Sequence, residues 1–140
     1  MPPEAMAARV SYLTVFTRDV ERLPTFYAEV FDLPEVESSR SERYRELDAG
    51  GLMLGFPSVD AYAVLDMQDQ AQPDGVRSMI TFAAETLAAV DRFTARATER
   101  GARLVKGPFA TSFDQYLSVV LDPEGNAFRI SAPAGAEEAP

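Results

Sequence analysis

The chain has 140 residues, 46% of them hydrophobic, which is enough for one domain with a buried core. It contains neither cysteine nor histidine, which excludes disulfides, thiolate chemistry and the side chain that most often serves as general base or metal ligand. A formal net charge of −9 excludes the basic surface that nucleic-acid binding needs and disfavours anionic membranes.

The beginning of the chain, MPPEAMAARV, lacks the charged-then-apolar order of a secretory signal, and no apolar run is long enough to cross a membrane. We therefore expect a cytoplasmic protein with neither membrane nor nucleic-acid partners. The acidic balance is compatible with a cationic ligand, but solubility alone would also account for it.

The first half of the chain predicts the element order βαβββ. Residues 10–17 are rich in β-branched and aromatic side chains, which is typical of a strand. Asp19 can cap the helix that follows, and Leu33-Pro34 ends it. Three short strands are expected next, at about 35–39, 43–48 and 52–56.

The second half predicts the same order after a connector. Residues 58–76 contain Pro73 and Asp74-Gly75 and are expected to join the two halves. A strand at 78–84 is followed by a helix with apolar residues at helical spacing, which Gly101 ends. The remaining strands are expected at 103–106, 115–121 and 127–131, with a loop over 107–114.

The last two strands enclose the sequence Asp122-Pro123-Glu124-Gly125-Asn126. Pro123 presets φ for a turn, Gly125 or Asn126 can adopt a positive φ, and Asp122 can accept hydrogen bonds from the backbone. This pattern predicts a β-hairpin near the end of the domain.

An internal repeat relates the two halves. Tyr12–Phe16 aligns with Met79–Ala83 at a spacing of 67 residues, and Gly50–Leu54 aligns with Gly125–Arg129 at a spacing of 75. The sequence thus predicts one α+β domain, in which two βαβββ modules form a curved mixed sheet with outer helices and an inner cleft. The predicted divisions are a flexible N-terminus at 1–8, a domain at 9–132 with modules at 9–57 and 77–132, and a disordered acidic tail at 133–140.

Two stretches, VSYLTVFTRDVERLPTFY and VVLDPEGNAFRIS, resemble the vicinal oxygen chelate superfamily of glyoxalase I, extradiol dioxygenases and bleomycin-resistance proteins. The resemblance covers about residues 9–132. It implies paired βαβββ modules, assembled as a homodimer with clefts between modules.

Metal-binding relatives carry His or Gln on the first strand of a module and Glu on the strand that leaves the hairpin. The resemblance places these positions at Tyr12, Leu54, Met79 and Arg129 in this chain. A neutral thioether and a permanent cation do not hold a divalent ion, and a catalytic metal site needs at least three nitrogen or oxygen ligands. We therefore expect neither a metal nor another cofactor.

A cleft without metal ligands but with aromatic rings resembles the bleomycin-resistance branch. Rings hold a planar ligand by burial of apolar area, at roughly 25 cal/mol per Å², and by offset stacking. The predicted function is metal-independent binding and sequestration of a small planar aromatic natural product or antibiotic. The predicted ligand-binding residues are Tyr12, Phe16, Tyr44, Leu54, Phe56, Tyr62, Met79, Phe109, Phe113, Tyr116 and Arg129.

Each of these residues also has a purely structural interpretation. The rings can simply pack in a core, as is expected for Phe26, Phe82, Phe93 and Phe128. Arg129 either pairs with an acid such as Asp48 or Glu46, or meets an acceptor group on the ligand with its planar fork.

Two other classes of function stay open. A metal-free lyase, isomerase or cyclase could use Tyr12 or Tyr116 as proton donor and Glu46 or Asp48 as base. A module that only recognises other proteins would not need a lined cleft. Recovery of an intact or an altered ligand separates binding from catalysis.

Overall fold

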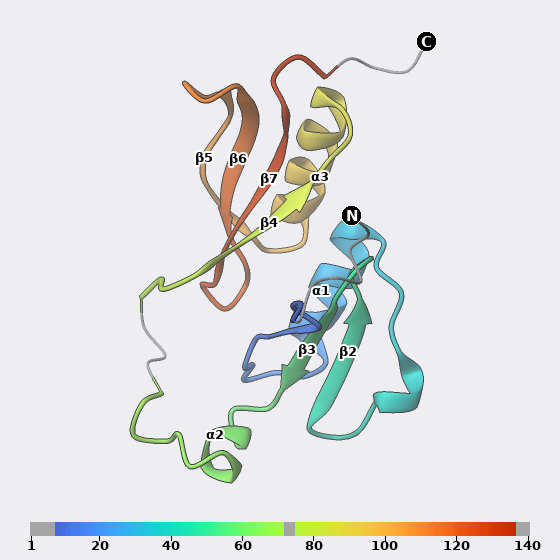
Figure 1. The fold of residues 1–140 in the computed structure, drawn as a ribbon, viewed down its shortest axis with the longest axis vertical. Helices are drawn as coiled ribbons and strands as arrows, with labels where there is room; N and C mark the ends of the chain where they lie inside the picture. Colours follow the sequence, from blue (N-terminus) through green and yellow to red (C-terminus); the bar gives the residue numbers. More distant parts are fainter. Residues whose placement is uncertain (1–7, 72–74, 137–140) are drawn as a thin grey trace. The chain divides into compact units, whose positions relative to one another are not determined.

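The computed structural model describes residues 8–71 and 75–136 and has the α+β fold that the sequence predicts. It divides into two compact units, with the boundary between Asp69 and Gln70. Each unit contains one sheet with a long helix against one face (Figure 1). The predictions for 1–7 and 137–140 lie outside the described residues. Within the described ranges, no helix has the length and apolar character needed to cross a membrane.

The first unit has a mixed three-stranded sheet in the order β1-β3-β2. β1 (Tyr12–Thr14) runs parallel to β3 (Met53–Pro57), and β2 (Tyr44–Asp48) runs antiparallel to β3. The sheet is completed by an isolated bridge between Thr17 and Ser58. The predicted connector begins here with a single helical turn, α2 (Ala61–Val64).

The helix α1 (Arg22–Phe31) packs its apolar side against this sheet. Asp19 caps it as predicted, because its Oδ1 accepts hydrogen bonds from the backbone N–H groups of Glu21 at 3.0 Å and Arg22 at 2.9 Å. The buried ring of Tyr27 stacks on Phe56 of β3 with 5.7 Å between ring centroids. The helix thus covers the face of the sheet to which Phe56 belongs.

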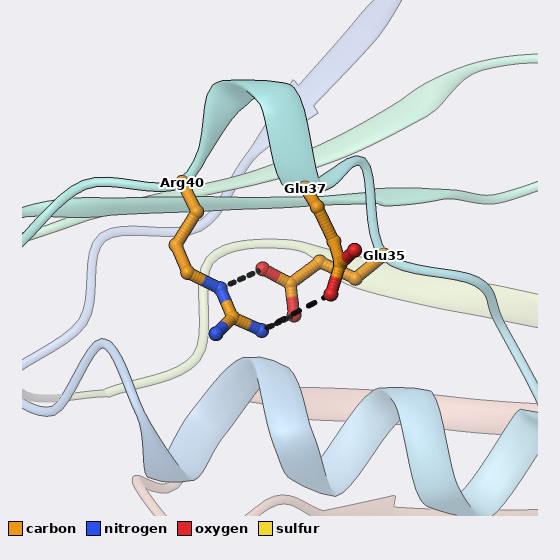
Figure 2. Close-up of polar contacts among 3 residues, drawn as sticks. All are labelled: Glu35, Glu37 and Arg40. Carbon is orange, nitrogen blue, oxygen red and sulfur yellow. Dashed lines mark hydrogen bonds and ion pairs between the residues drawn. The ribbon is translucent and has the colours of Figure 1, made fainter.

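The strand predicted at 35–39 is wrong. Glu35 makes one isolated bridge to Leu47, and a 3₁₀ turn follows at Glu37–Ser39. Arg40 then reaches back to Glu35 through two contacts, Nε to Oε2 at 2.7 Å and Nη2 to Oε1 at 2.6 Å, with Glu37 Oε1 4.0 Å from Nη2 (Figure 2). Glu and Ser favour turns over strands, and this two-pronged ion pair closes the segment on itself.

The second unit has a mixed four-stranded sheet in the order β4-β7-β6-β5. β4 pairs parallel with β7, and the other two pairs are antiparallel. β5 is longer than predicted and continues into the expected loop, and its register with β6 shifts twice, between Leu104 and Lys106 and between Lys106 and Phe109. The strands are β4 (Met79–Ala83), β5 (Arg103–Ala110), β6 (Gln115–Leu121) and β7 (Ala127–Pro133).

The helix α3 (Leu87–Glu99) covers one face of the second sheet. Thr86 caps it by accepting a hydrogen bond from the backbone N–H of Ala89 at 3.0 Å. The buried hydroxyls of Thr94 on α3 and Ser118 on β6 lie 2.7 Å apart. Phe128 of β7 is buried as predicted, whereas Phe82 of β4 and Phe93 of α3 itself are half-buried.

The predicted hairpin turn joins β6 to β7. Gly125 has a φ of 88°, a conformation that favours glycine. Asp122 is buried and accepts hydrogen bonds from the backbone N–H groups of Glu124 at 2.8 Å and Asn126 at 3.0 Å. β7 then continues to Pro133, and the N–H of Ala134 donates to the backbone carbonyl of Asp114, so the structure describes the beginning of the predicted tail at 133–140.

Candidate functional site

In each sheet, one face packs on the long helix of its own unit, and among the described residues of that unit the opposite face has no such helix. We call the second one the helix-free face. In the first sheet it carries Tyr12 and Thr14 of β1, Tyr44 and Glu46 of β2, and Met53 and Gly55 of β3, because cross-strand partners share a face.

A buried carboxylate lies at the centre of the helix-free face of the first sheet. Glu46 is only 5% exposed. Its Oε1 accepts a hydrogen bond from the Tyr44 hydroxyl at 2.7 Å, and its Oε2 accepts a longer one from the Tyr12 hydroxyl at 3.4 Å. Two phenols from two different strands therefore converge on one acid.

Gly55 makes this arrangement possible. It is the cross-strand partner of Glu46, and a Cβ built on it would lie 2.6 Å from the Tyr44 hydroxyl oxygen. Because glycine has no side chain, the Tyr44 ring can lie across β3 and present its hydroxyl to Glu46. Nothing in the sequence pattern distinguishes this glycine from those of the turns, so its role could not be predicted.

Tyr44 is a hydrogen-bond donor and not a base in this site. Burial of its phenol, followed by the hydrogen bond to Glu46 and the charge of that carboxylate, raises the pKa of Tyr44 well above its usual value. The phenol therefore stays protonated at neutral pH and keeps its hydroxyl hydrogen directed at Glu46.

A second aromatic group in the first unit pairs two predicted site residues. Phe16, which follows β1, stacks on Tyr62 of α2 with ring centroids 4.0 Å apart and an interplanar angle of 23°. Both side chains are half-buried. Phe16 was predicted on a strand and Tyr62 in the connector, and their contact does not follow from the sequence pattern.

The expected position of Leu54 and Phe56 in the cleft is wrong. Leu54 is 1% exposed and Phe56 is 0% exposed, and both belong to the face of β3 that packs on α1. The repeat spacing explains the difference. Gly55 pairs with Thr14 as Arg129 pairs with Thr81, so the true spacing from β3 to β7 is 74 residues and not 75. A slip of one residue exchanges the two faces of a strand.

The helix-free face of the second sheet carries Met79, Thr81 and Arg129. Nε of Arg129 donates a hydrogen bond to the Thr81 hydroxyl oxygen at 2.7 Å. Among the described residues no carboxylate lies within ion-pair distance of Arg129, so the predicted pairing with Asp48 or Glu46 is not observed. Its two terminal nitrogens are therefore available to other acceptors.

The three remaining aromatic candidates have different surroundings. Phe109 pairs with Leu117 across β5 and β6, and the Lys106 ammonium lies 4.4 Å from its ring centroid. Phe113 is exposed in the turn between these strands. Tyr116 instead faces α3, where its hydroxyl donates to Asp91 at 2.6 Å, and this hydrogen bond raises the pKa of Tyr116. Tyr116 therefore lies on the opposite face of the sheet from Arg129.

The comparisons with known proteins agree with the geometry. The sequence profile of the glyoxalase/bleomycin resistance protein/dioxygenase superfamily matches residues 9–130. The chain belongs to this superfamily. No curated protein matches the chain.

Solved structures support the superfamily assignment. A glyoxalase/bleomycin resistance protein/dioxygenase family enzyme from Burkholderia phytofirmans is 37% identical, with a TM-score of 0.86, and the match covers 90% of this chain and 99% of that one. A glyoxalase-related enzyme from Fulvimarina pelagi is 19% identical, with a TM-score of 0.79 and coverage of 89% and 87%. A lactoylglutathione lyase from Agrobacterium tumefaciens is 18% identical, with a TM-score of 0.69 and coverage of 94% and 100%. The last two show a shared fold only.

The residues at the superfamily's metal-binding positions do not fit a metal ion. With the register corrected, these positions fall on Tyr12, Gly55, Met79 and Arg129. Tyr12 offers a phenol that already donates a hydrogen bond to Glu46, and Gly55 has no side chain. Met79 offers a neutral thioether, and Arg129 offers a cation. Within residues 8–71 and 75–136, no three His, Cys, Asp or Glu residues gather closely enough to hold a metal.

Proposed function

We propose that this superfamily member binds and sequesters, without a metal ion, a small planar aromatic natural product or antibiotic. The observation that carries the proposal is the replacement of every metal-binding position by a residue unsuited to the task, on faces that keep aromatic and polar side chains. Such a surface supports stacking and hydrogen bonding with a flat molecule.

The proposal also covers the oligomeric state and the cellular location of the protein. The superfamily resemblance supports a homodimer. The lack of cysteine and of a secretory pattern in the sequence supports the cytoplasm as its location. Light scattering after size exclusion should then give about twice the chain mass of 15.3 kDa. A monomeric mass would contradict this part and leave the binding proposal intact.

The binding proposal is tested by isothermal titration against a panel of planar polycyclic compounds, each with and without EDTA. We expect saturable binding that EDTA does not change, with the compound recovered intact by chromatography. Tyr12→Ala should weaken binding, because it removes a ring of the helix-free face. Tyr116→Phe is the control, because Tyr116 faces α3 and its ring is kept. Equal losses in both variants would count against the proposal.

A second candidate is a metal-free lyase, isomerase or cyclase, and one observation favours it. Tyr44 and Tyr12 both donate to the buried Glu46, so a proton donor and a proton acceptor already lie in contact. The alternative donor Tyr116 is engaged with Asp91 on the helix side and does not support this reaction. A compound recovered with a changed mass or an altered ring, at a rate lost in Glu46→Gln, would favour catalysis over sequestration.

A further inference from the structure

Glu46 is buried without a cation beside it. It is 5% exposed, and within the described part of the chain its carboxylate contacts only the two neutral hydroxyls of Tyr12 and Tyr44. Buried carboxylates in proteins are normally paired with a positive charge, because removal from water is costly for an anion. Glu46 therefore lacks the positively charged partner that a buried carboxylate normally has.

The other charged group of the predicted site is in a different situation. Arg129 is only half-buried, and its Nε already donates to Thr81. Water can solvate the rest of its guanidinium, so the unmet demand for a counter-charge is smaller at Arg129 than at Glu46. Glu46 therefore has the stronger requirement for a ligand of opposite charge.

The two phenols hold Glu46 unequally. Tyr44 donates at 2.7 Å and lies across Gly55, so its hydroxyl is fixed on Oε1. Tyr12 is 51% exposed and its hydroxyl lies 3.4 Å from Oε2, at the long limit of a hydrogen bond. The Oε2 atom is therefore the one that another donor can take over, with Tyr12 turning away as it binds.

We infer that the ligand carries a protonated amine, which binds Oε2 of Glu46 in place of the Tyr12 hydroxyl. This inference rests on the proposed binding function and names the chemistry of its ligand. An ammonium group supplies both the missing positive charge and a stronger donor than a phenol. The aromatic part of the same molecule would then lie over the helix-free face around Tyr12 and Met53.

The test compares two planar probes by isothermal titration. Mitoxantrone is an anthraquinone with protonated amines, and anthraquinone-2-sulfonate has the same ring system with an anionic group. The wild type should prefer mitoxantrone. Glu46→Gln keeps the shape and an acceptor oxygen, and it should weaken mitoxantrone binding about ten- to a hundredfold, the range for loss of a charge-assisted hydrogen bond. Binding of the sulfonate should not weaken.

Two further variants keep the test specific. Glu42→Gln removes the same charge from an exposed turn, so it corrects for the general attraction of a cation to an acidic protein. Tyr12→Phe removes the hydroxyl that the amine displaces, so mitoxantrone should bind it as tightly as the wild type or a few-fold more tightly. A loss of binding in Tyr12→Phe would show that the hydroxyl contacts the ligand, against the inference.

The outcomes separate this inference from the proposed function. If the wild type binds the sulfonate but not mitoxantrone, or if Glu46→Gln weakens both probes equally, the amine assignment is overturned and the binding function stands. If neither probe binds, the proposed function is contradicted and the inference fails with it. Thermal unfolding of Glu46→Gln near the wild-type midpoint excludes a folding defect as the cause of lost binding.

Discussion

Neighbouring residues on β3 have opposite roles, and their substitution tests the assignment of faces. Leu54 is buried under α1, so Leu54→Ala should lower the free energy of unfolding by about 2–5 kcal/mol. Met53 is half-buried on the helix-free face, so Met53→Ala should lower the free energy of unfolding clearly less than Leu54→Ala does. Urea unfolding followed by circular dichroism measures both. Equal costs, or a larger cost at Met53, would mean that the faces are exchanged.

The Tyr44 hydroxyl donates a hydrogen bond to the buried carboxylate of Glu46. Removal of this hydroxyl is the second test at the scale of single residues. Tyr44→Phe takes the short hydrogen bond from Glu46 and should lower the free energy of unfolding by about 1–3 kcal/mol, the cost of an unsatisfied buried group. Gly55→Ala should reproduce part of this loss, because its Cβ would collide with the same hydroxyl. If Gly55→Ala is neutral, the close approach of Tyr44 to β3 does not hold the hydrogen bond in place.

The same residue predicts an alkaline limit to stability. The folded-state pKa of Tyr44 is raised, chiefly by burial, so its contribution is fully present below the unfolded value of about 10 and is lost as the pH rises further. Between pH 5 and about 9 this group should cause no change. Unfolding free energies measured from pH 8 to 11 should fall less steeply in Tyr44→Phe than in the wild type. Tyr116, whose pKa is also raised, accounts for part of the slope that remains.

At the scale of elements, α1 depends on one capping side chain. Asp19 accepts two backbone N–H groups, and these hydrogen bonds, first that of Arg22 and then that of Glu21, lower its pKa. A lowered pKa means that the contribution is present above the unfolded value of about 3.9 and is lost as the pH falls through the folded value. Asp19→Ala should therefore lower the melting temperature at pH 7 and change it less near pH 3. A pH-independent loss would point to packing and not to the cap.

The sequence predicted most elements, and its two main errors have different causes. β-branched runs, the Asp19 cap and the turn after Asp122 are local signals, and the structure contains each of them. The strand predicted at 35–39 is a turn in the structure, because the ion pair between Glu35 and Arg40 closes that segment on itself. The faces of β3 were exchanged because repeat spacing fixes a strand only to about one residue, whereas the face depends on parity.

Single residues of the candidate site could be named from the sequence, but the way in which they come together could not be predicted. Tyr12, Tyr44 and Glu46 could each be named from the sequence, yet their convergence depends on the pairing of β1 and β2 with β3 and on the missing side chain of Gly55. Hydrogen bonds between strands that are distant in the sequence follow from register alone. No local propensity encodes the pairing of Arg129 with Thr81 either.

At the scale of the whole molecule, net charge acts on the rate of binding more than on its strength. A formal charge of −9 attracts a cationic ligand over a distance of about one Debye length. The association rate constant for mitoxantrone should therefore fall as salt is raised from about 20 to 500 mM, while that for anthraquinone-2-sulfonate should rise. Stopped-flow fluorescence quenching measures both. Identical salt dependence for the two probes would show that the overall charge does not steer the ligand.

The superfamily assignment makes metal binding the sharpest question for the whole chain, because the positions at which the resemblance places metal ligands are occupied by Tyr12, Gly55, Met79 and Arg129. A metal at a concentration 100 times its dissociation constant stabilises a folded protein by about 2.7 kcal/mol, which raises the melting temperature by several degrees. We expect no such rise with nickel, zinc or ferrous ions at sub-millimolar concentration, and no stoichiometric metal by mass spectrometry of the purified protein. A rise that EDTA reverses, with about one ion bound per chain, would contradict this expectation. It would require metal ligands that the side chains at Tyr12, Gly55, Met79 and Arg129 do not provide.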